Sequence, residues 1–192
     1  MVIFLILVGL YHPILIQIPS WLPYLHNIIT SHPKSHVGEI GLDNARWEQI
    51  NPTTKELVCP METQIVAFEV QLHLACHLGK AVSIHSVRSW GVLMKSLTNV
   101  KTQRQQLKKR MKQENRNVDI SSFWVLPPHF YFHAFSGNGS IVHQVNSICC
   151  KDTPSQTYYG FAPVINFKSP KTVDTIQTVG IDRLVLESDL EN

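Results

Sequence analysis

The amino-acid sequence predicts an α/β fold built on a parallel β-sheet, either open or closed. Six short apolar segments have the composition of strands, and helical patterns lie between most of them. The chain has 192 residues, of which 44% are apolar and 16% charged. This length and composition fit a single domain with a sizeable core and exclude disordered, collagen-like and disulfide-stapled proteins.

The first predicted strand, Val2–Gly9, is continuously apolar, as a strand covered on both faces would be. The apolar run Met1–Leu10 could also pass for the core of a signal peptide, but it has no basic residues before it and no small-residue cleavage site. His12 and Pro13 end the run before it reaches the length of a membrane span. We therefore expect a buried strand and no membrane partner.

The next segments continue the alternation of helix and strand. A short helix is predicted over Trp21–Thr30, and a strand over Val37–Leu42. The clearest helix covers Met61–Leu78, where apolar residues recur at three- and four-residue spacing and Gly79 follows as a stop. Its apolar stripe consists of Ile65, Phe68, Leu72, Ala75 and Cys76, and its other faces carry Glu62, Glu69, His73 and His77. Ala81–His85 is the third predicted strand.

The second half of the chain repeats the pattern. A helix is predicted over Trp90–Leu97, and strands over Phe130–Phe135, Tyr158–Ile165 and Leu184–Glu187, with helical patterns before the last two. Between the helix over Trp90–Leu97 and the strand over Phe130–Phe135, the segment from about 100 to 117 interrupts the repeat. Its core, Lys101–Arg116, contains seven basic residues and one acidic residue.

The basic segment holds all of the chain's net positive charge, which is +3 overall. It has almost no apolar residues and is rich in helix formers. It is therefore expected to be an exposed helix or a disordered insertion, solvated on all sides. A contact with nucleic-acid phosphates is the alternative interpretation.

The cysteines point to a reducing compartment. Cys59, Cys76, Cys149 and Cys150 form no CxxC pair, and a domain of this size does not need them as disulfides. We expect reduced thiols and a cytoplasmic or nuclear protein.

Polar side chains lie in or at the ends of four predicted strands: Glu39, His85, His133 and Asp189. The carboxyl ends of parallel strands meet on one face of a sheet, where α/β enzymes place their sites. Two carboxylates and two imidazoles meeting there would suit Mg²⁺, Mn²⁺ or Zn²⁺. A lone histidine at a strand end is more often a hydrogen-bonded core residue than a metal ligand, whereas a carboxylate in an apolar strand is costly to bury unpaired.

Local sequences carry a resemblance to a known family. In order along the chain they are VGEIGLD (37–43), FEVQLHLA (68–75), AVSIHS (81–86), HAFSG (133–137) and DRLVLESD (182–189). Together they resemble successive signatures of the TatD-type deoxyribonucleases, over nearly the whole chain. Ser188, where many members have Thr, resembles the fungal branch.

This resemblance implies a (β/α)8 TIM-barrel-like fold that uses divalent metal ions, Mg²⁺ first and Mn²⁺ or Zn²⁺ as alternatives, to hydrolyse DNA phosphodiesters, often from a 3′ end. It implies that Glu39 is shared between metals, that His85 and His133 hold one metal, and that Asp189 is both a ligand and a catalytic proton acceptor. Substrate-binding roles fall to His12, in GLYHP, and to Arg88, which follows Val87 where the family has arginine.

The sequence also departs from the family. Members begin with a strand that carries an HxH motif, and no such strand precedes Met1. We therefore expect a single incomplete barrel over residues 1–192, without the first two strands and the last helix. Three functions stay open: an active nuclease acting on DNA, a catalytically inactive protein-interaction module that uses exposed sheet edges or the basic segment, and a hydrolase of small amides or esters. The basic segment favours a phosphate substrate over the third.

Overall fold

A computed structural model describes residues 19–45, 47–51, 53–114 and 121–189. The predicted strand Val2–Gly9 and His12 lie outside these residues. Five strands form one sheet in the described part of the chain, in the order β1 (Val37–Asp43), β4 (Val82–Val87), β5 (His129–Phe132), β6 (Gln156–Phe161) and β7 (Leu184–Leu186). Every neighbouring pair is parallel, as predicted.

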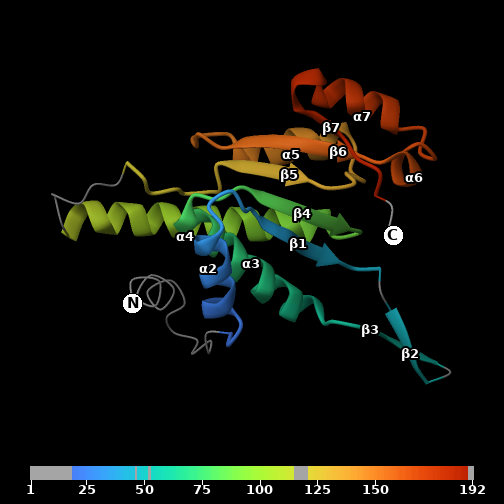
Figure 1. The fold of residues 1–192 in the computed structure, drawn as a ribbon. Coiled ribbons are helices and arrows are strands. Elements are labelled where there is room, and N and C mark those ends of the chain that lie inside the picture. The colour runs from blue at the N-terminus through green and yellow to red at the C-terminus, as the bar shows by residue number, and fades with distance from the viewer. Residues whose placement is uncertain (1–18, 46, 52, 115–120, 190–192) are drawn as a thin grey trace.

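The helices of the described residues are α2 (Leu22–Ser31), α3 (Met61–Leu78), α4 (Trp90–Glu114), α5 (Gly139–Cys149), α6 (Pro163–Asn166) and α7 (Thr172–Val179), with the 3₁₀ helix η1 at Ile181–Arg183. Helices α3, α4, α5 and α7 lie between successive parallel strands, and α3 packs on α4, α4 on α5 and α5 on α7 (Figure 1). The bounds of α3 are those predicted. It ends at Gly79, whose φ of 60° lies in the left-handed region that glycine adopts without strain.

The core lies between the sheet and the helices. Strand side chains alternate, so that Val82 and Ile84 of β4 and Phe130 and Phe132 of β5 are buried, whereas their neighbours in sequence face the other side of the sheet. Aromatic rings fill much of this layer, with the centroids of Phe132 and Tyr159 5.3 Å apart. Each fully buried apolar side chain of this size contributes about 1.5–3 kcal/mol to folding. The opposite face of the sheet is consequently left for polar residues.

The basic segment is the second half of α4 as far as residue 114. Its helical form confirms one of the two expected states, but the expectation of solvation on all sides is wrong. Arg104 is 2% exposed, its Nε donates to the Trp124 carbonyl at 2.8 Å, and its guanidinium lies 4.6 Å from the centroid of the Phe123 ring. The chain that follows α4 packs back against the helix and buries this cation.

Two strand predictions need correction, and one pair of strands was missed. The predicted strand over 130–135 ends at Phe132, because Ala134 has a φ of 40° and turns the chain away from the sheet. The predicted strand over 158–165 ends at Phe161, because Pro163 occupies the first turn of helix α6, where proline is favoured. An antiparallel hairpin of β2 (Trp47–Asn51) and β3 (Thr54–Leu57) was not predicted.

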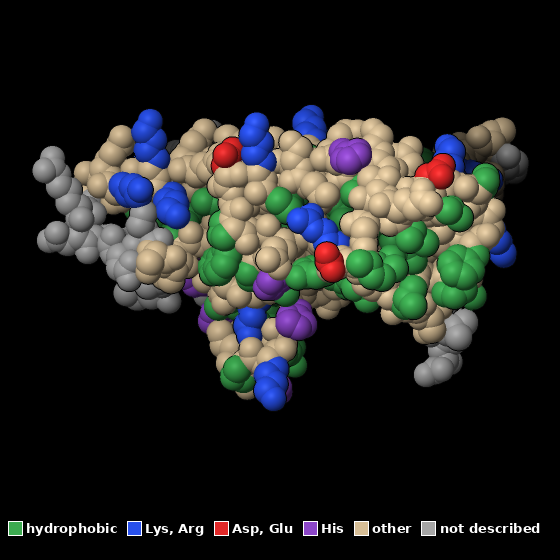
Figure 2. All heavy atoms as spheres, turned by 90° about the horizontal axis from the view of Figure 1, so that it is seen from above, with side chains coloured by type: hydrophobic (Ala, Val, Ile, Leu, Met, Phe, Trp, Pro, Cys, Tyr) green, Lys and Arg blue, Asp and Glu red, His purple; other side chains and the backbone are tan. Residues whose placement is uncertain are grey.

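Several large apolar side chains are exposed at one end of the molecule. In Figure 2, apolar side chains gather at the end of the molecule that holds α6 and α7. The large apolar residues exposed there are Val164, Ile165, Phe167, Val173 and Ile181. Among the described residues, no helix is both long enough and apolar enough to cross a membrane.

Candidate metal centre

Glu39 is set into the site by an irregular stretch of β1. Val37 pairs with Val82 and Ile40 with Ile84, so that β1 has one residue more than β4 between these two pairs. Such a bulge redirects the side chains within it. Further along, Gly41 pairs with His85, and a Cβ atom at Gly41 would stand 1.9 Å from the His85 carbonyl oxygen. The glycine therefore allows β1 to approach β4 at the position of the histidine.

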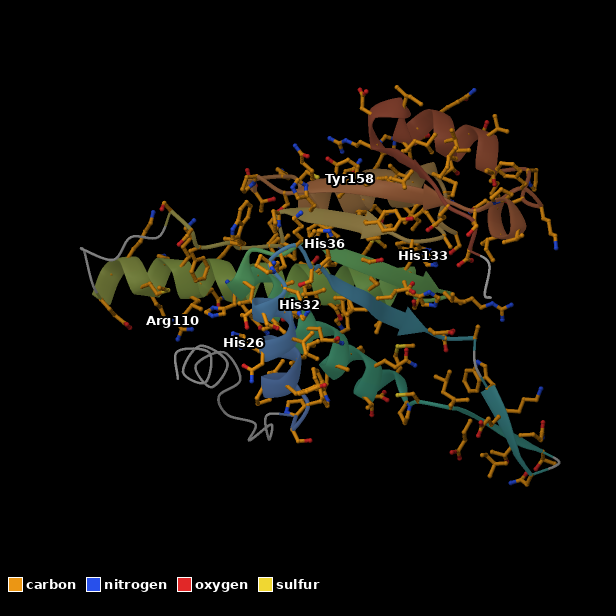
Figure 3. All side chains as sticks on the ribbon, viewed as in Figure 1. His26, His32, His36, Arg110, His133 and Tyr158 are labelled. Atoms are coloured by element: carbon orange, nitrogen blue, oxygen red, sulfur yellow. The ribbon has the colours of Figure 1, made fainter. Side chains whose placement is uncertain are left out.

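The four residues predicted as ligands meet at the carboxyl end of the sheet. Glu39 Oε1 lies 3.3 Å from His85 Nδ1 and 3.8 Å from His133 Nε2. His133 Nε2 lies 2.9 Å from Asp189 Oδ1. Figure 3 labels His133 at this end of the sheet, apart from His26 of α2 and His32, which directly follows α2. Strands β1, β4, β5 and β7 each supply one of the four, either within the strand or just after it.

Glu187 holds His133 in place, and the sequence analysis did not assign it to the site. Its carboxylate accepts hydrogen bonds from His133 Nδ1 at 2.6 Å and from the Tyr131 hydroxyl. It also accepts one from the backbone N–H of Ala134. With Nδ1 fixed on this carboxylate, Nε2 is directed at Glu39 and Asp189.

A glycine in β6 makes the contact between Tyr131 and Glu187 possible. Strand β6 lies between β5, which carries Tyr131, and β7, which precedes Glu187. A Cβ atom at Gly160 would lie 2.4 Å from Glu187 Oε1 and 2.5 Å from the Tyr131 hydroxyl oxygen. Because Gly160 has no side chain, Tyr131 and Glu187 can meet over β6.

The carboxylates change the acid–base behaviour of the rings they contact. Burial lowers the pKa of His133, but the charges of Glu39, Glu187 and Asp189 and the hydrogen bond to Glu187 outweigh burial and raise it. Burial, followed by the hydrogen bond to Glu187, raises the pKa of Tyr131 well above its usual range. The Tyr131 hydroxyl therefore stays protonated and can donate, and a cation that binds Nε2 of His133 competes with a proton there.

Backbone strain is concentrated beside these residues. Four non-glycine residues of the described chain have positive φ, and three of them follow strands of the site: Arg88 (50°), Ala134 (40°) and Asp189 (49°). Such conformations cost about 1–3 kcal/mol each and persist where the surroundings impose them, commonly at functional sites. Here they turn the chain sharply where β4, β5 and β7 end.

A pocket of about 410 Å³ opens beside Glu39 and His85. Asp43, at the end of β1, also lines it, and its Oδ2 lies 4.0 Å from His85 Nε2. The sequence analysis quoted Asp43 within a motif but gave it no role. Arg88 is exposed three residues after His85, beside the carboxyl end of β4, which is compatible with its expected role towards substrate.

The donor atoms that meet here have the chemistry of a divalent-metal site. Imidazole nitrogens and carboxylate oxygens suit Zn²⁺ and Mn²⁺, and the carboxylates suit Mg²⁺. Their separations of 2.9–3.8 Å bracket the roughly 3.0–3.4 Å between neighbouring ligands on a metal at about 2.1 Å. Within the described ranges, no group of three or more His, Cys, Asp or Glu side chains is placed to hold a metal ion, and the contacts among the four residues are pairwise.

Known proteins resemble this chain in sequence and in structure. The sequence model of the family described as TatD related DNase matches residues 4–190. The Cut9-interacting protein scn1 of Schizosaccharomyces pombe is 27% identical over 189 residues, which cover 91% of this chain and 56% of scn1.

Two solved structures share the fold. The TatD homologue YJJV of Escherichia coli K12 superposes with a TM-score of 0.57 at 23% identity, over 88% of this chain and 50% of its own. An amidohydrolase of Saccharomyces cerevisiae gives a TM-score of 0.57 at 20% identity, over 88% and 45%. The chain thus has the TIM-barrel-like α/β fold of TatD homologues and spans about half the length of these relatives. Because the family model matches residues 4–190, the chain belongs to the TatD related DNase family, a family of metal-dependent hydrolases.

Proposed function

We propose that this protein is a metal-dependent phosphodiester hydrolase that cleaves DNA. The observation that carries the proposal is the meeting of Glu39, His85, His133 and Asp189, from four parallel strands, at one end of the sheet. Membership of the TatD related DNase family supports the reaction class.

Glu39, His85, His133 and Asp189 would hold the divalent metal, with Mg²⁺ as the first choice and Mn²⁺ or Zn²⁺ as alternatives. The metal would polarise the phosphoryl oxygens and lower the pKa of a bound water. Asp189, whose side chain is 26% exposed and whose Oδ1 lies 2.9 Å from His133 Nε2, would accept the proton of the attacking water.

Other side chains orient the site and the substrate. Glu187 keeps the His133 ring in one orientation by accepting from Nδ1, so that Nε2 faces the ligand position. Arg88 would contact a phosphate of the DNA, as an exposed cation next to the carboxyl end of β4. His12 is proposed for the same role from its sequence motif alone.

The direct test measures cleavage of end-labelled single-stranded and duplex DNA with Mg²⁺ or Mn²⁺. The Asp189→Asn chain should lose activity by at least about 100-fold, and Asp182→Asn, which changes an exposed carboxylate of η1, should keep it. Absence of cleavage by the folded, metal-loaded chain would refute the proposal. Hydrolysis of amides or esters without cleavage of DNA would place the protein among small-molecule hydrolases instead.

Protein interaction is the second candidate function, with a cytoplasmic or nuclear location. The relative from S. pombe is named for interaction with Cut9, and the exposed apolar residues around α6 and α7 form a surface of the kind that partners cover. A Phe167→Glu, Ile181→Glu chain should lose binding to the Cut9 counterpart of its own cell while cleaving DNA normally. Unchanged binding would contradict a partner on this surface.

A further inference from the structure

The β2–β3 hairpin stands beside the candidate metal centre and packs little against the rest of the protein. Figure 1 shows it projecting from the carboxyl end of β1. The chain leaves the site at Asp43 to enter the hairpin and returns through Val58 and Cys59. These last two residues line the same pocket as Glu39 and His85. The base of the hairpin is therefore one wall of the site.

Gln64 of α3 fixes the hairpin to this position. Its Oε1 accepts from the Asp43 N–H at 2.7 Å, and its Nε2 donates to the Asp43 carbonyl at 3.0 Å. The same Nε2 donates to the Cys59 carbonyl at 2.8 Å. One side chain thus holds together the outgoing and the returning chain at the base of the hairpin, next to the metal centre.

The two faces of the hairpin differ in charge. Directly opposite residues of an antiparallel pair share a face, and alternate residues lie on opposite faces. Trp47 is opposite Leu57, and Gln49 is opposite Lys55, so that one face combines an indole with a cation. The other face carries one pair of like charge, Glu48 opposite Glu56. A polyanion is repelled by the second face and attracted to the first.

The indole ring of Trp47 is accessible for stacking. The residue is 49% exposed, and its Nε1 donates to the Asn44 carbonyl at 3.2 Å, which anchors one edge of the ring. Lys55 is exposed on the same face. An exposed aromatic ring beside a cation is the combination by which proteins hold unpaired nucleotides, with the base stacked on the ring and the phosphate near the cation.

We propose that the face formed by Trp47 and Lys55 is a nucleotide subsite that holds a base of the DNA strand at a distance from the bond to be cleaved. The inference rests on the proposed function for its substrate. Trp47 follows Asp43 by four residues, a reach of at most about 14 Å. At about 3.4 Å per stacked nucleotide, the subsite lies within about four nucleotides of the metal centre.

The test is fluorescence anisotropy of labelled hexathymidylate with the 192-residue chain in Ca²⁺. Loss of one base–aromatic stack should weaken binding of Trp47→Ala about tenfold, and Trp47→Phe should recover most of the affinity. Trp21→Ala is the matched control, because Trp21 is 39% exposed and belongs to the start of α2. Lys55→Gln should reduce the slope of log K against log salt by about 0.7, the value for one phosphate contact on a single strand.

Equal affinities for Trp47→Ala and Trp21→Ala would overturn the subsite, as would a wild-type chain that does not bind the strand. Cleavage with Mg²⁺ is measured in parallel on the wild type. Affinity lost in Trp47→Ala without any cleavage by the wild type would refute the nuclease and still support the subsite. Circular dichroism of each variant ensures that the comparison is between folded chains.

Discussion

Replacing Glu187 by Gln tests how the site holds His133. The carboxylate accepts from His133, Tyr131 and the N–H of Ala134, and its side chain is 14% exposed. A glutamine offers one oxygen and one NH₂ group, so at least one of these donors must face another donor. Leaving a buried donor unpaired costs about 1–3 kcal/mol, and loss of a carboxylate behind a ligating histidine lowers metal affinity about 10–100-fold. The energy cost and the loss of affinity agree in size, because a tenfold change in affinity corresponds to about 1.4 kcal/mol. We expect Glu187→Gln to lose metal affinity within this range.

The assay is calorimetric titration with Mn²⁺, together with DNA cleavage at saturating metal. Tyr131→Phe removes one donor and leaves the charge, so that its loss should be smaller than that of Glu187→Gln. Gly160→Ala places a methyl group where Tyr131 and Glu187 meet, and it should weaken Mn²⁺ binding without any change of charge. If Glu187→Gln bound Mn²⁺ as tightly as the wild type, Glu187 would have no role in orienting His133.

Three further predictions concern stability and reactivity. Burial and then the charge of Arg104 lower the pKa of His73 from 6.5 to about 3, so the unfolded chain takes up a proton that the folded chain refuses. Stability should therefore fall by about 2 kcal/mol between pH 7 and pH 5 in urea titrations; a His73→Gln chain with the same fall would contradict this. Cys59 is exposed and should react first with Ellman's reagent, so a fast phase that survives Cys59→Ser would refute the assignment. Gly41→Ala drives a methyl group into the His85 carbonyl and should destabilise the chain by more than about 3 kcal/mol, whereas a cost below about 1 kcal/mol would show that β1 can move away.

Local pattern was sufficient for some elements. The helix over Met61–Leu78 was predicted at its bounds because an apolar stripe and a terminal glycine are both short-range signals. The approach of Glu39, His85, His133 and Asp189 could be expected because parallel strands bring their carboxyl ends to one edge. These predictions needed no knowledge of which distant side chains touch.

Features that depend on distant contacts were not predictable. The role of Glu187 requires Tyr131, His133 and the empty space at Gly160, which come from three strands. The burial of Arg104 requires the chain near Trp124, and the sequence around it shows only charge. The hairpin had a weak local signal, an Asn-Pro dipeptide at 51–52 between two short alternating stretches.

Binding of Mn²⁺ by the folded chain, followed by electron paramagnetic resonance, tests the central claim most directly. The account predicts that the wild type binds the ion and that Glu39→Gln, His85→Asn, His133→Asn and Asp189→Asn each weaken binding by at least about tenfold. Glu62→Gln, an exposed carboxylate of α3, should bind as the wild type does. Equal binding by the wild type and the four site variants would contradict a metal centre at the end of this sheet, as would no binding by any of them.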